Sequence, residues 1–391
     1  MKSLYFLLIL PLFLASCQIP RHSDPPEKSI GALFAHPGVM HSQESLNFIR
    51  SKVAAQEKPW YPAWQKLQKS KSVSLSWKPS PFPRIDRGPY NDPDIGSSEF
   101  LNDGHAAYTH ALNWALSENE ASARKAAEIL DAWSTTLETV AGHDARLLIG
   151  MAGLRYIAAA ELLVHTWDGW SKEGQATFVK MLREIWYPLI KDFYPSANGN
   201  WDAAMMQTMI AIGVFLEDRE IFDRAANYYL HGKGNGPVRN YFKKSGQSQE
   251  TGRDQAHTQM GLEFLVNTCE TAWIQGYDLY GVKDNRLLKG FEYTAKFNLG
   301  EDVPYEPYRS YQGRYHYKKI SNKARGRLRP MYEKALNHYH HRKNLPTPYA
   351  HQVVHKKRPE SGGGSSLPWS SLMFANLSQE THKQNLALTT P

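Results

Sequence analysis

Residues 120–140 read EASARKAAEILDAWSTTLETV, and the spacing of their apolar residues indicates how the chain folds. These residues recur at steps of three and four, which places them on one stripe of an α-helix: Ala126, Ile129, Leu130, Trp133 and Leu137. Gly and Pro separate further helical segments, and strand-like alternation is nearly absent. The predicted helices span residues 43–56, 61–69, 100–117, 120–140, 146–165, 172–193, 201–216, 221–231, 254–280 and 285–298.

Helices joined by short loops, without a sustained heptad, predict an all-α domain. We expect an incomplete (α/α) toroid, or barrel, of antiparallel helix pairs. A straight bundle or a superhelical array is the alternative, but no fixed-period repeat is visible.

The segment before the helices has the composition of an export signal. Lys2 precedes the apolar run 4–10 and the sequence LASC at 14–17, a pattern typical of a secretory signal that also resembles a bacterial lipobox. We predict a lipoprotein signal peptide at 1–16 and lipidation of Cys17; an ordinary signal peptide with a chance cysteine is the alternative. Gln18 is not the Asp associated with inner-membrane retention. This favours the outer membrane for an exported bacterial lipoprotein of the periplasm or cell surface.

The remaining chain divides into three parts by composition. A polar, Pro-containing tether covers 17–32, the helical domain covers 33–358, and a tail rich in Gly and Ser covers 359–391 and is expected to be mobile. No apolar run after the leader is expected to span a bilayer, so the lipid is the only expected membrane contact. Cys269 is the only cysteine after Cys17, so no intramolecular disulfide is expected in the mature chain.

The composition suits a protein that binds acidic polymers. The chain has a formal charge of +8 and contains 11 Trp and 21 Tyr. Aromatic rings offer stacking surfaces for sugars, although they also fill cores. Positive charge attracts polyanions without distinguishing nucleic acid from acidic polysaccharide.

Polar side chains gather at two predicted helix starts. Asn200 lies in the sequence NGNWD at 198–202. It is either an ordinary N-cap or a donor to a substrate carboxylate, with Trp201 as a wall.

The second helix start is the sequence QSQETGRDQAH at 247–257. Arg253 falls in a first helical turn, where its charge opposes the helix dipole, so either a nearby carboxylate or a bound anion must compensate it. His257 is four residues further on and shares its face. Gln249 adds a further polar group, which favours a binding site here.

The region 302–329 carries five tyrosines and reads as a long ordered loop over a binding surface. A tyrosine is a competent acid when protonated, and it serves as a base only where positive charge stabilises the phenolate. Arg309 and Arg314 are close in sequence. Tyr311 is the first candidate for proton transfer and Tyr315 the second, while Tyr308 is a candidate for substrate binding.

No motif predicts a metal or nucleotide site. His351 and His355 have the spacing of a zinc pair but lack the Glu of His-Glu-x-x-His. Neither a phosphate-binding glycine loop nor a Gly-x-Ser-x-Gly elbow is present.

Three stretches together resemble the alginate lyase superfamily of helical-toroid polysaccharide lyases: HPGVM at 36–40, NGNWD at 198–202 and SGQSQETGRDQAHTQMG at 245–261. The resemblance covers residues 34–360. It implies an incomplete (α/α) barrel that cleaves uronic acid polymers, such as alginate, polymannuronate or polyglucuronate, by β-elimination. It implies no cofactor.

The resemblance also implies roles for single residues. The carboxylate-neutralising Asn matches Asn200. Some members continue with a catalytic His, where this chain has Trp201, so His257 is the implied replacement. The catalytic Tyr falls at Tyr311 or Tyr315, with Arg309 as the accompanying Arg.

These roles define the expected activity. Asn200, with His257 or Arg253, would neutralise the uronate carboxylate, and the tyrosine would move protons at C5 and O4. His257 would be the base when the C5 proton lies on the opposite ring face. We expect a monomer that acts on an acidic polysaccharide and binds no nucleic acid.

Two other functions compete with this interpretation. An inverting glycoside hydrolase would need two carboxylates, for which Asp94, Asp144, Asp202 and Asp254 are candidates without a selecting spacing. A non-catalytic lipoprotein that binds acidic glycans would use the same basic and aromatic surface.

Overall fold

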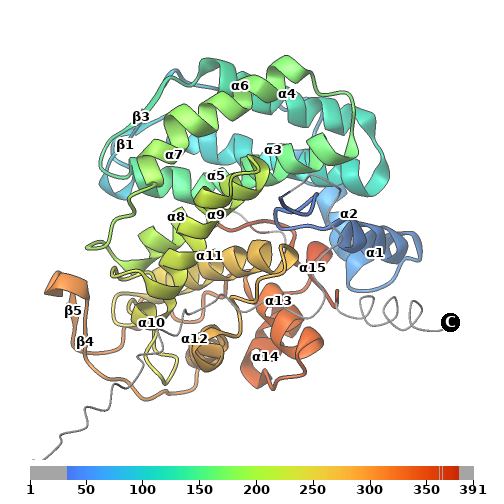
Figure 1. The fold of residues 1–391 in the computed structure, drawn as a ribbon. Helices are drawn as coiled ribbons and strands as arrows, with labels where there is room; N and C mark the ends of the chain where they lie inside the picture. Colours follow the sequence, from blue (N-terminus) through green and yellow to red (C-terminus); the bar gives the residue numbers. More distant parts are fainter. Residues whose placement is uncertain (1–32, 361, 363, 378–391) are drawn as a thin grey trace, which may run out of the picture.

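The structure is a computed structural model that describes residues 33–360, 362 and 364–377. The predicted signal peptide, Cys17 and the whole tether therefore lie outside the described residues. Helices dominate the chain (Figure 1). They are α1 (Gln43–Ala54), α2 (Trp60–Gln68), α3 (Ser97–Ser117), α4 (Glu120–Thr136), α5 (Ala145–Thr166), α6 (Lys172–Met181), α7 (Tyr187–Ile190), α8 (Gly199–Phe215), α9 (Arg219–His231), α10 (Val238–Tyr241), α11 (Gln255–Ile274), α12 (Val282–Asn298), α13 (Tyr332–Ala335), α14 (Pro348–Lys357) and α15 (Ser370–Met373).

Every helix predicted from the sequence is present, and the all-α (α/α) toroid fold is confirmed. The predicted helix 172–193 continues from α6 into α7 through a wider turn at Leu182–Trp186. The sequence did not predict α10, α13, α14 or α15, of which only α14 exceeds four residues. Short helices of this kind carry little periodic signal.

The inner layer consists of helices that are buried on almost every side. α5 buries every residue from Ala145 to Leu163 except Arg146, and α8 buries every residue from Gly199 to Val214. α8 packs between α5 and α11, and α3 packs against α5. A helix that is apolar all round must be enclosed by others. α5 is long and apolar enough to cross a membrane by length and composition, contrary to the sequence expectation, but it is a core helix here.

The outer layer consists of amphipathic helices. In α4, the stripe of Ala126, Ile129, Leu130 and Trp133 is buried, as its spacing predicts. α4 packs against α3 and α6, α9 packs against α8, and α12 packs against α11. Each outer helix turns one buried face inward, and together these faces enclose the inner layer. This arrangement of inner and outer helices is that of an (α/α) toroid.

The inner helices α5, α8 and α11 run in the same direction. At one end, Asn200 in the first turn of α8 accepts a hydrogen bond from Arg253, two residues before α11. At the other end, Glu217 follows α8 and Glu161 lies near the end of α5, and both contact His36. We call these ends the amino-terminal rim and the carboxyl-terminal rim. The 17 residues of α8 separate them by about 25 Å.

The strands are short and lie outside the helical layers. β1 (Arg84–Arg87) pairs antiparallel with β2 (Asp94–Ile95) and parallel with β3 (Thr139–Ala141). β4 (Tyr308–Arg309) and β5 (His316–Tyr317) form an antiparallel hairpin, which lies at the margin of the molecule on the side of α10 (Figure 1). The Tyr-rich region 302–329 is therefore a long loop that contains this short hairpin.

The chain beyond residue 358 was expected to be a mobile tail, but its described part up to Leu377 is packed against the domain. Trp369 is buried and donates a hydrogen bond from Nε1 to Oγ1 of Thr109 at 2.9 Å. The backbone N–H of Leu367 donates to the Glu263 carboxylate at 2.9 Å. The Gly and Ser composition hid this apolar anchor. Residues 378–391 lie outside the described residues.

Candidate active site

The first turn of α8 places Asn200 at the amino-terminal rim. Asn198 is the N-cap residue by backbone conformation, and its side chain makes no capping hydrogen bond. Asn200 therefore does not cap the helix, which excludes the alternative that the sequence left open. Its side chain lies 3.8 Å from the sulfur of Met260 and accepts a long hydrogen bond of 3.5 Å from Arg253.

Glu250 fixes the position of this turn relative to Arg253. Its carboxylate is fully buried and accepts hydrogen bonds from the backbone N–H of Asn200 (3.0 Å) and from the hydroxyl of Tyr241 (2.9 Å). It also forms an ion pair of 2.7 Å with Arg253. Glu250 thus compensates the charge of Arg253, one of the two possibilities that the sequence left open. The pKa of Arg253 is lowered by burial, but the attraction of Glu250 outweighs this and raises it.

Gln249 is a positioning residue in this structure. It is fully buried; its Oε1 accepts from the backbone N–H of Gly199 at 2.8 Å, and its Nε2 donates to Oδ1 of Asn198 at 3.0 Å. Both polar atoms of its amide are therefore used inside the protein. This differs from the direct substrate contact expected from the sequence.

Asp254, Arg253 and His257 form a connected group at the start of α11. Asp254 caps the helix by accepting from the backbone N–H of His257 at 2.8 Å, and its second oxygen lies 2.7 Å from Nδ1 of the same residue. Burial raises the pKa of Asp254, but the hydrogen bonds from His257 outweigh burial and lower it to about 2. The His257 ring is 30% exposed, so a ligand has access to it.

β5 brings Tyr317 to the same rim. Its hydroxyl donates to Oδ1 of Asn198 at 3.0 Å, and its ring stacks with that of Tyr315 at a centroid distance of 6.2 Å. Burial, followed by the nearby Glu250 carboxylate, raises the pKa of Tyr317 to about 12. Tyr317 is therefore protonated at neutral pH and can act as an acid.

Aromatic rings and a second arginine continue this surface. Trp201 is nearly buried, and its ring lies edge-on to those of His143 (5.6 Å) and Tyr194 (5.4 Å). The guanidinium of Arg314 lies 5.4 Å from the ring of Tyr315 and 5.9 Å from that of Tyr194. These residues provide flat apolar and cationic faces of the kind that sugars and carboxylates contact.

The other predicted residues of the hairpin line a neighbouring cavity of about 810 Å³. We call it the basic cavity, since six Lys and Arg residues line it: Lys233, Arg239, Lys243, Lys244, Arg286 and Arg309. Tyr308 and Tyr311 also line it. The hydroxyl of Tyr308 donates to the backbone carbonyl of Asn240, and the backbone N–H of Tyr311 donates to Asn235 at 2.6 Å. Neither Asn200 nor His257 lines the basic cavity.

The four aspartates considered for an inverting hydrolase each contact other groups of the protein. Asp202 is fully buried and accepts from the backbone N–H of Tyr194 at 2.8 Å and the hydroxyl of Tyr228 at 2.9 Å; burial raises its pKa to about 6. Asp94 accepts from the Ser98 side chain. Asp144 contacts His143 at 2.7 Å. Asp254 is the cap described above.

The sequence prediction missed two residues that organise this site. The sequence offers Glu250 only as one of the carboxylates near Arg253, and Tyr317 only as one of the five tyrosines of the region 302–329. The spacing of Tyr315 and Tyr317 was an available signal, because residues two apart in a strand share a face. The contacts of Glu250 with α8 carried no sequence signal, since they join residues 50 positions apart.

The comparisons with known proteins agree with this fold. The alginate lyase family matches residues 51–303. The structure of alginate lyase A1-III from Sphingomonas species A1 is 13% identical, with a TM-score of 0.63 over 88% of this chain and 97% of that one. A variant of the same enzyme, complexed with a tetrasaccharide, is 14% identical, with a TM-score of 0.64 over 87% and 99%. An alginate lyase from Bacteroides ovatus is 13% identical, with a TM-score of 0.58 over 87% and 100%. No curated protein sequence matches the chain.

Proposed function

Because this chain belongs to the alginate lyase family and is a polysaccharide lyase, we propose that it cleaves uronic acid polymers by β-elimination at the amino-terminal rim. The single observation that supports this site is the convergence of Asn200, Arg253 and His257, which joins an amide, a guanidinium and an imidazole in one hydrogen-bonded group. The amide and the guanidinium are donors that suit a carboxylate, and the imidazole can serve as a base. Alginate or polymannuronate is the proposed substrate, with polyglucuronate as a second one.

Neutralisation of the uronate carboxylate is the first step. The amide of Asn200 and the guanidinium of Arg253 donate to the carboxylate attached to C5. Their hydrogen bonds stabilise the negative charge that develops on it as the C5 proton leaves, which makes this proton more acidic. Glu250 and Gln249 hold the two groups in place without contacting the sugar.

Proton transfer completes the elimination. A base removes the C5 proton, the electron pair forms the C4=C5 double bond, and the C4–O4 bond breaks as an acid protonates O4. Tyr317 is the proposed acid, and its stacked neighbour Tyr315 is the alternative on the same face of the hairpin. His257 is the proposed base for the ring face opposite the hairpin, as in guluronate, the C5 epimer of mannuronate.

Tyr311 and Arg309 keep a proposed role next to this group. They line the basic cavity, and Asn235 connects this cavity to the residue that precedes the N-cap of α8. The carboxamide of Asn235 accepts from Tyr311 N–H and donates to the carbonyl of Ala197 at 2.6 Å. A polymer bound at Asn200 would extend towards these residues. Tyr308 and Trp201 are the proposed aromatic contacts.

The test is the ultraviolet absorbance of the new C4=C5 double bond. The chain is incubated with alginate, polymannuronate, polyguluronate and polyglucuronate, and with a neutral glucan as the control. Absorbance that rises with any uronan supports the proposal. New reducing ends without absorbance would indicate a hydrolase, and binding without either would indicate a non-catalytic glycan-binding protein.

Export and lipidation remain part of the proposal. The basic residue, apolar run and LASC sequence of 1–17 support an outer-membrane lipoprotein anchored through Cys17, a residue outside the described part of the chain. Metabolic labelling with a fatty acid tests this. Label should enter the wild type and not Cys17→Ser, whereas equal labelling would contradict it.

A further inference from the structure

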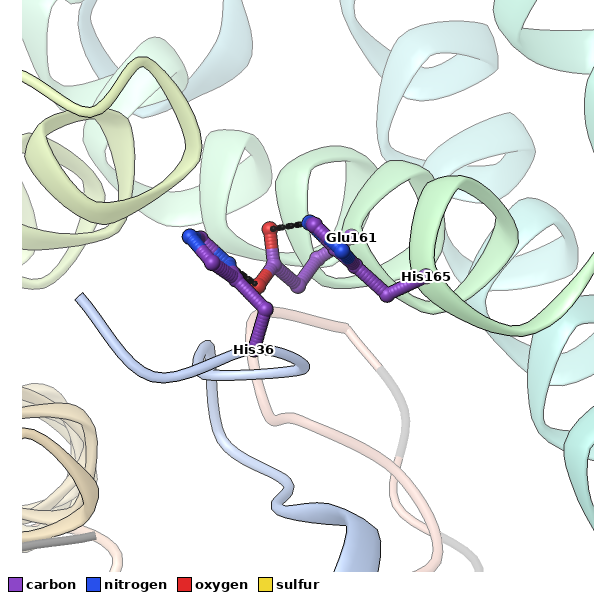
Figure 2. Close-up of side chains that lie close together, drawn as sticks. All are labelled: His36, Glu161 and His165. Carbon is purple, nitrogen blue, oxygen red and sulfur yellow. Dashed lines mark hydrogen bonds and ion pairs between the residues drawn. The ribbon is translucent and has the colours of Figure 1, made fainter. Parts of the chain in front are cut away.

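We propose that His36, Glu161 and His165 form a structural zinc site at the carboxyl-terminal rim, about one helix length from the proposed catalytic residues. Two imidazoles and a carboxylate are ligands that Zn²⁺ prefers. Their ligand atoms lie within 4.8 Å of one another, and in Figure 2 each imidazole has one nitrogen facing one oxygen of the Glu161 carboxylate. This cluster is separate from the basic cavity and the candidate active site.

The backbone arrangement brings the three ligands together from two parts of the chain. Glu161 and His165 are four residues apart near the end of α5, so they share one face of the helix. His36 comes from the segment before α1. This segment is fastened at the same place, because the backbone N–H of Gly38 donates to Glu161 at 2.8 Å and that of Ala35 donates to Gln275 at 2.8 Å.

The Glu161 carboxylate is fully buried, and only one of its oxygens is hydrogen-bonded. Oε1 contacts His36 and accepts from the backbone N–H of Gly38, whereas Oε2 has no hydrogen-bond partner among the described residues. His165 Nε2 lies 3.7 Å from that oxygen, too far for a hydrogen bond. Its described ion-pair partners are His36 and His165, without a Lys or Arg. A buried carboxylate oxygen without a partner is costly, and a metal ion would bind this oxygen.

The two nitrogens of His36 both face carboxylates. Nδ1 lies 2.6 Å from Glu161, and Nε2 contacts Glu217. Burial lowers the pKa of His36, but its hydrogen bonds and charge attraction with Glu161 and Glu217 outweigh burial and raise it to about 9, so without a metal the protonated ring donates from both nitrogens. Zn²⁺ would take the place of the proton on Nδ1, and the Nε2–H would still donate to Glu217. A metal-bound histidine that donates its other N–H to a carboxylate is a common arrangement around zinc.

The geometry is close to that of a zinc site. Two ligands of one tetrahedral zinc lie roughly 3.4 Å apart, from bond lengths of about 2.0–2.1 Å. The separation of 3.7 Å between His165 and Glu161 is near this value. The separation of 2.6 Å joins His36 Nδ1 to the other oxygen, Oε1, so zinc bound to Oε2 would require the His36 ring to turn away from Oε1. The fourth position is left for water, since the His165 side chain is 30% exposed. The zinc would fasten the segment that carries His36 to the ends of α5 and α8.

Metal analysis of the purified chain without an affinity tag tests this proposal. After equilibration with equimolar zinc and gel filtration, we expect one zinc per chain in the wild type and none in His165→Gln or Glu161→Gln. Glu217→Gln should bind zinc roughly 10–100-fold more weakly, as for loss of a residue that orients a ligand. His351→Gln, which changes an exposed histidine elsewhere, is the matched control and should retain the zinc.

Two measurements on the wild type keep the test valid if the variants do not fold. Chelation should lower the melting temperature, and Co²⁺ in place of zinc should give the visible absorption of a tetrahedral nitrogen and oxygen site. Absence of stoichiometric zinc and of this cobalt spectrum would overturn the proposal. So would zinc that is lost in His351→Gln but retained in His165→Gln.

Discussion

Arg253 donates a hydrogen bond to Nε2 of His257 across 3.1 Å, and this contact determines which nitrogen of the imidazole carries the proton. A guanidinium has no lone pair to accept with, so Nε2 must be the acceptor. The proton of the neutral ring then lies on Nδ1, 2.7 Å from Asp254. Asp254 thus fixes the tautomer of His257, and the Nε2 lone pair becomes available for general-base catalysis when Arg253 turns to the substrate carboxylate.

Asp254→Asn should reduce turnover by His257 roughly 100-fold or more, because an amide can donate to Nδ1 and shift the proton to Nε2. We expect this loss in kcat on the uronan whose C5 proton His257 removes, with KM little changed. Asp168→Asn, at an exposed position, is the control. Unchanged kcat of Asp254→Asn on every uronan would contradict the orienting role.

Arg253→Lys should lower kcat/KM by about 10–100-fold. The guanidinium contacts Glu250, Asn200 and His257 together. An ammonium cannot reproduce this planar fork, and one charged hydrogen bond contributes about 1.5–3 kcal/mol. Initial rates of double-bond absorbance measure the effect. Arg124→Lys on the outer surface should retain full activity; an equal loss in both variants would argue against a specific role of Arg253.

Tyr317→Phe should lower kcat about 100-fold or more while KM stays within about threefold, since the ring remains and only the acidic hydroxyl is lost. Tyr315→Phe and Tyr311→Phe are matched variants. They should keep most of the activity if Tyr317 is the acid. The assignment moves to Tyr315 or Tyr311 if one of those variants is inactive and Tyr317→Phe is active.

The Asp254 carboxylate should stabilise the fold at neutral pH and lose this effect in acid. Its pKa is about 2 in the folded chain against an ordinary value of 3.8. The stabilisation, about 2 kcal/mol, is complete above pH 4 and disappears as the pH falls towards 2. The difference in unfolding free energy between wild type and Asp254→Asn should be roughly halved at pH 3 relative to pH 6 in urea titrations. A difference independent of pH would contradict this.

Trp369→Ala should destabilise the domain by roughly 3–5 kcal/mol, because Trp369 is buried and anchors the C-terminal segment to α3. Urea unfolding at neutral pH measures the effect. Leu75→Ala, which truncates an exposed side chain, should change stability by less than about 0.5 kcal/mol. A small effect of Trp369→Ala would mean that this segment adds little to the fold.

The sequence determined the helical layers because burial follows from local periodicity. The stripe of α4 fixed which face turns inward, and the continuous apolar composition of α5 reflects its enclosed position. The sequence also indicates Asn200, Arg253 and His257 as candidates, since polar residues at helix starts are visible without knowledge of contacts. The same approach failed for residues 364–377, where Gly and Ser hid the burial of Trp369.

Only the tertiary structure decided which of these polar groups meet. The contacts of Glu250 with Asn200, of Tyr317 with Asn198 and of His36 with Glu161 join positions that are 50, 119 and 125 residues apart. Such contacts depend on how segments far apart in the sequence pack at the ends of the inner helices. Local sequence patterns do not encode this packing. The sequence thus determined the helices and the types of chemical group, whereas packing determined their partners, because hydrogen bonds and ion pairs act over a few ångströms in space at any separation along the chain.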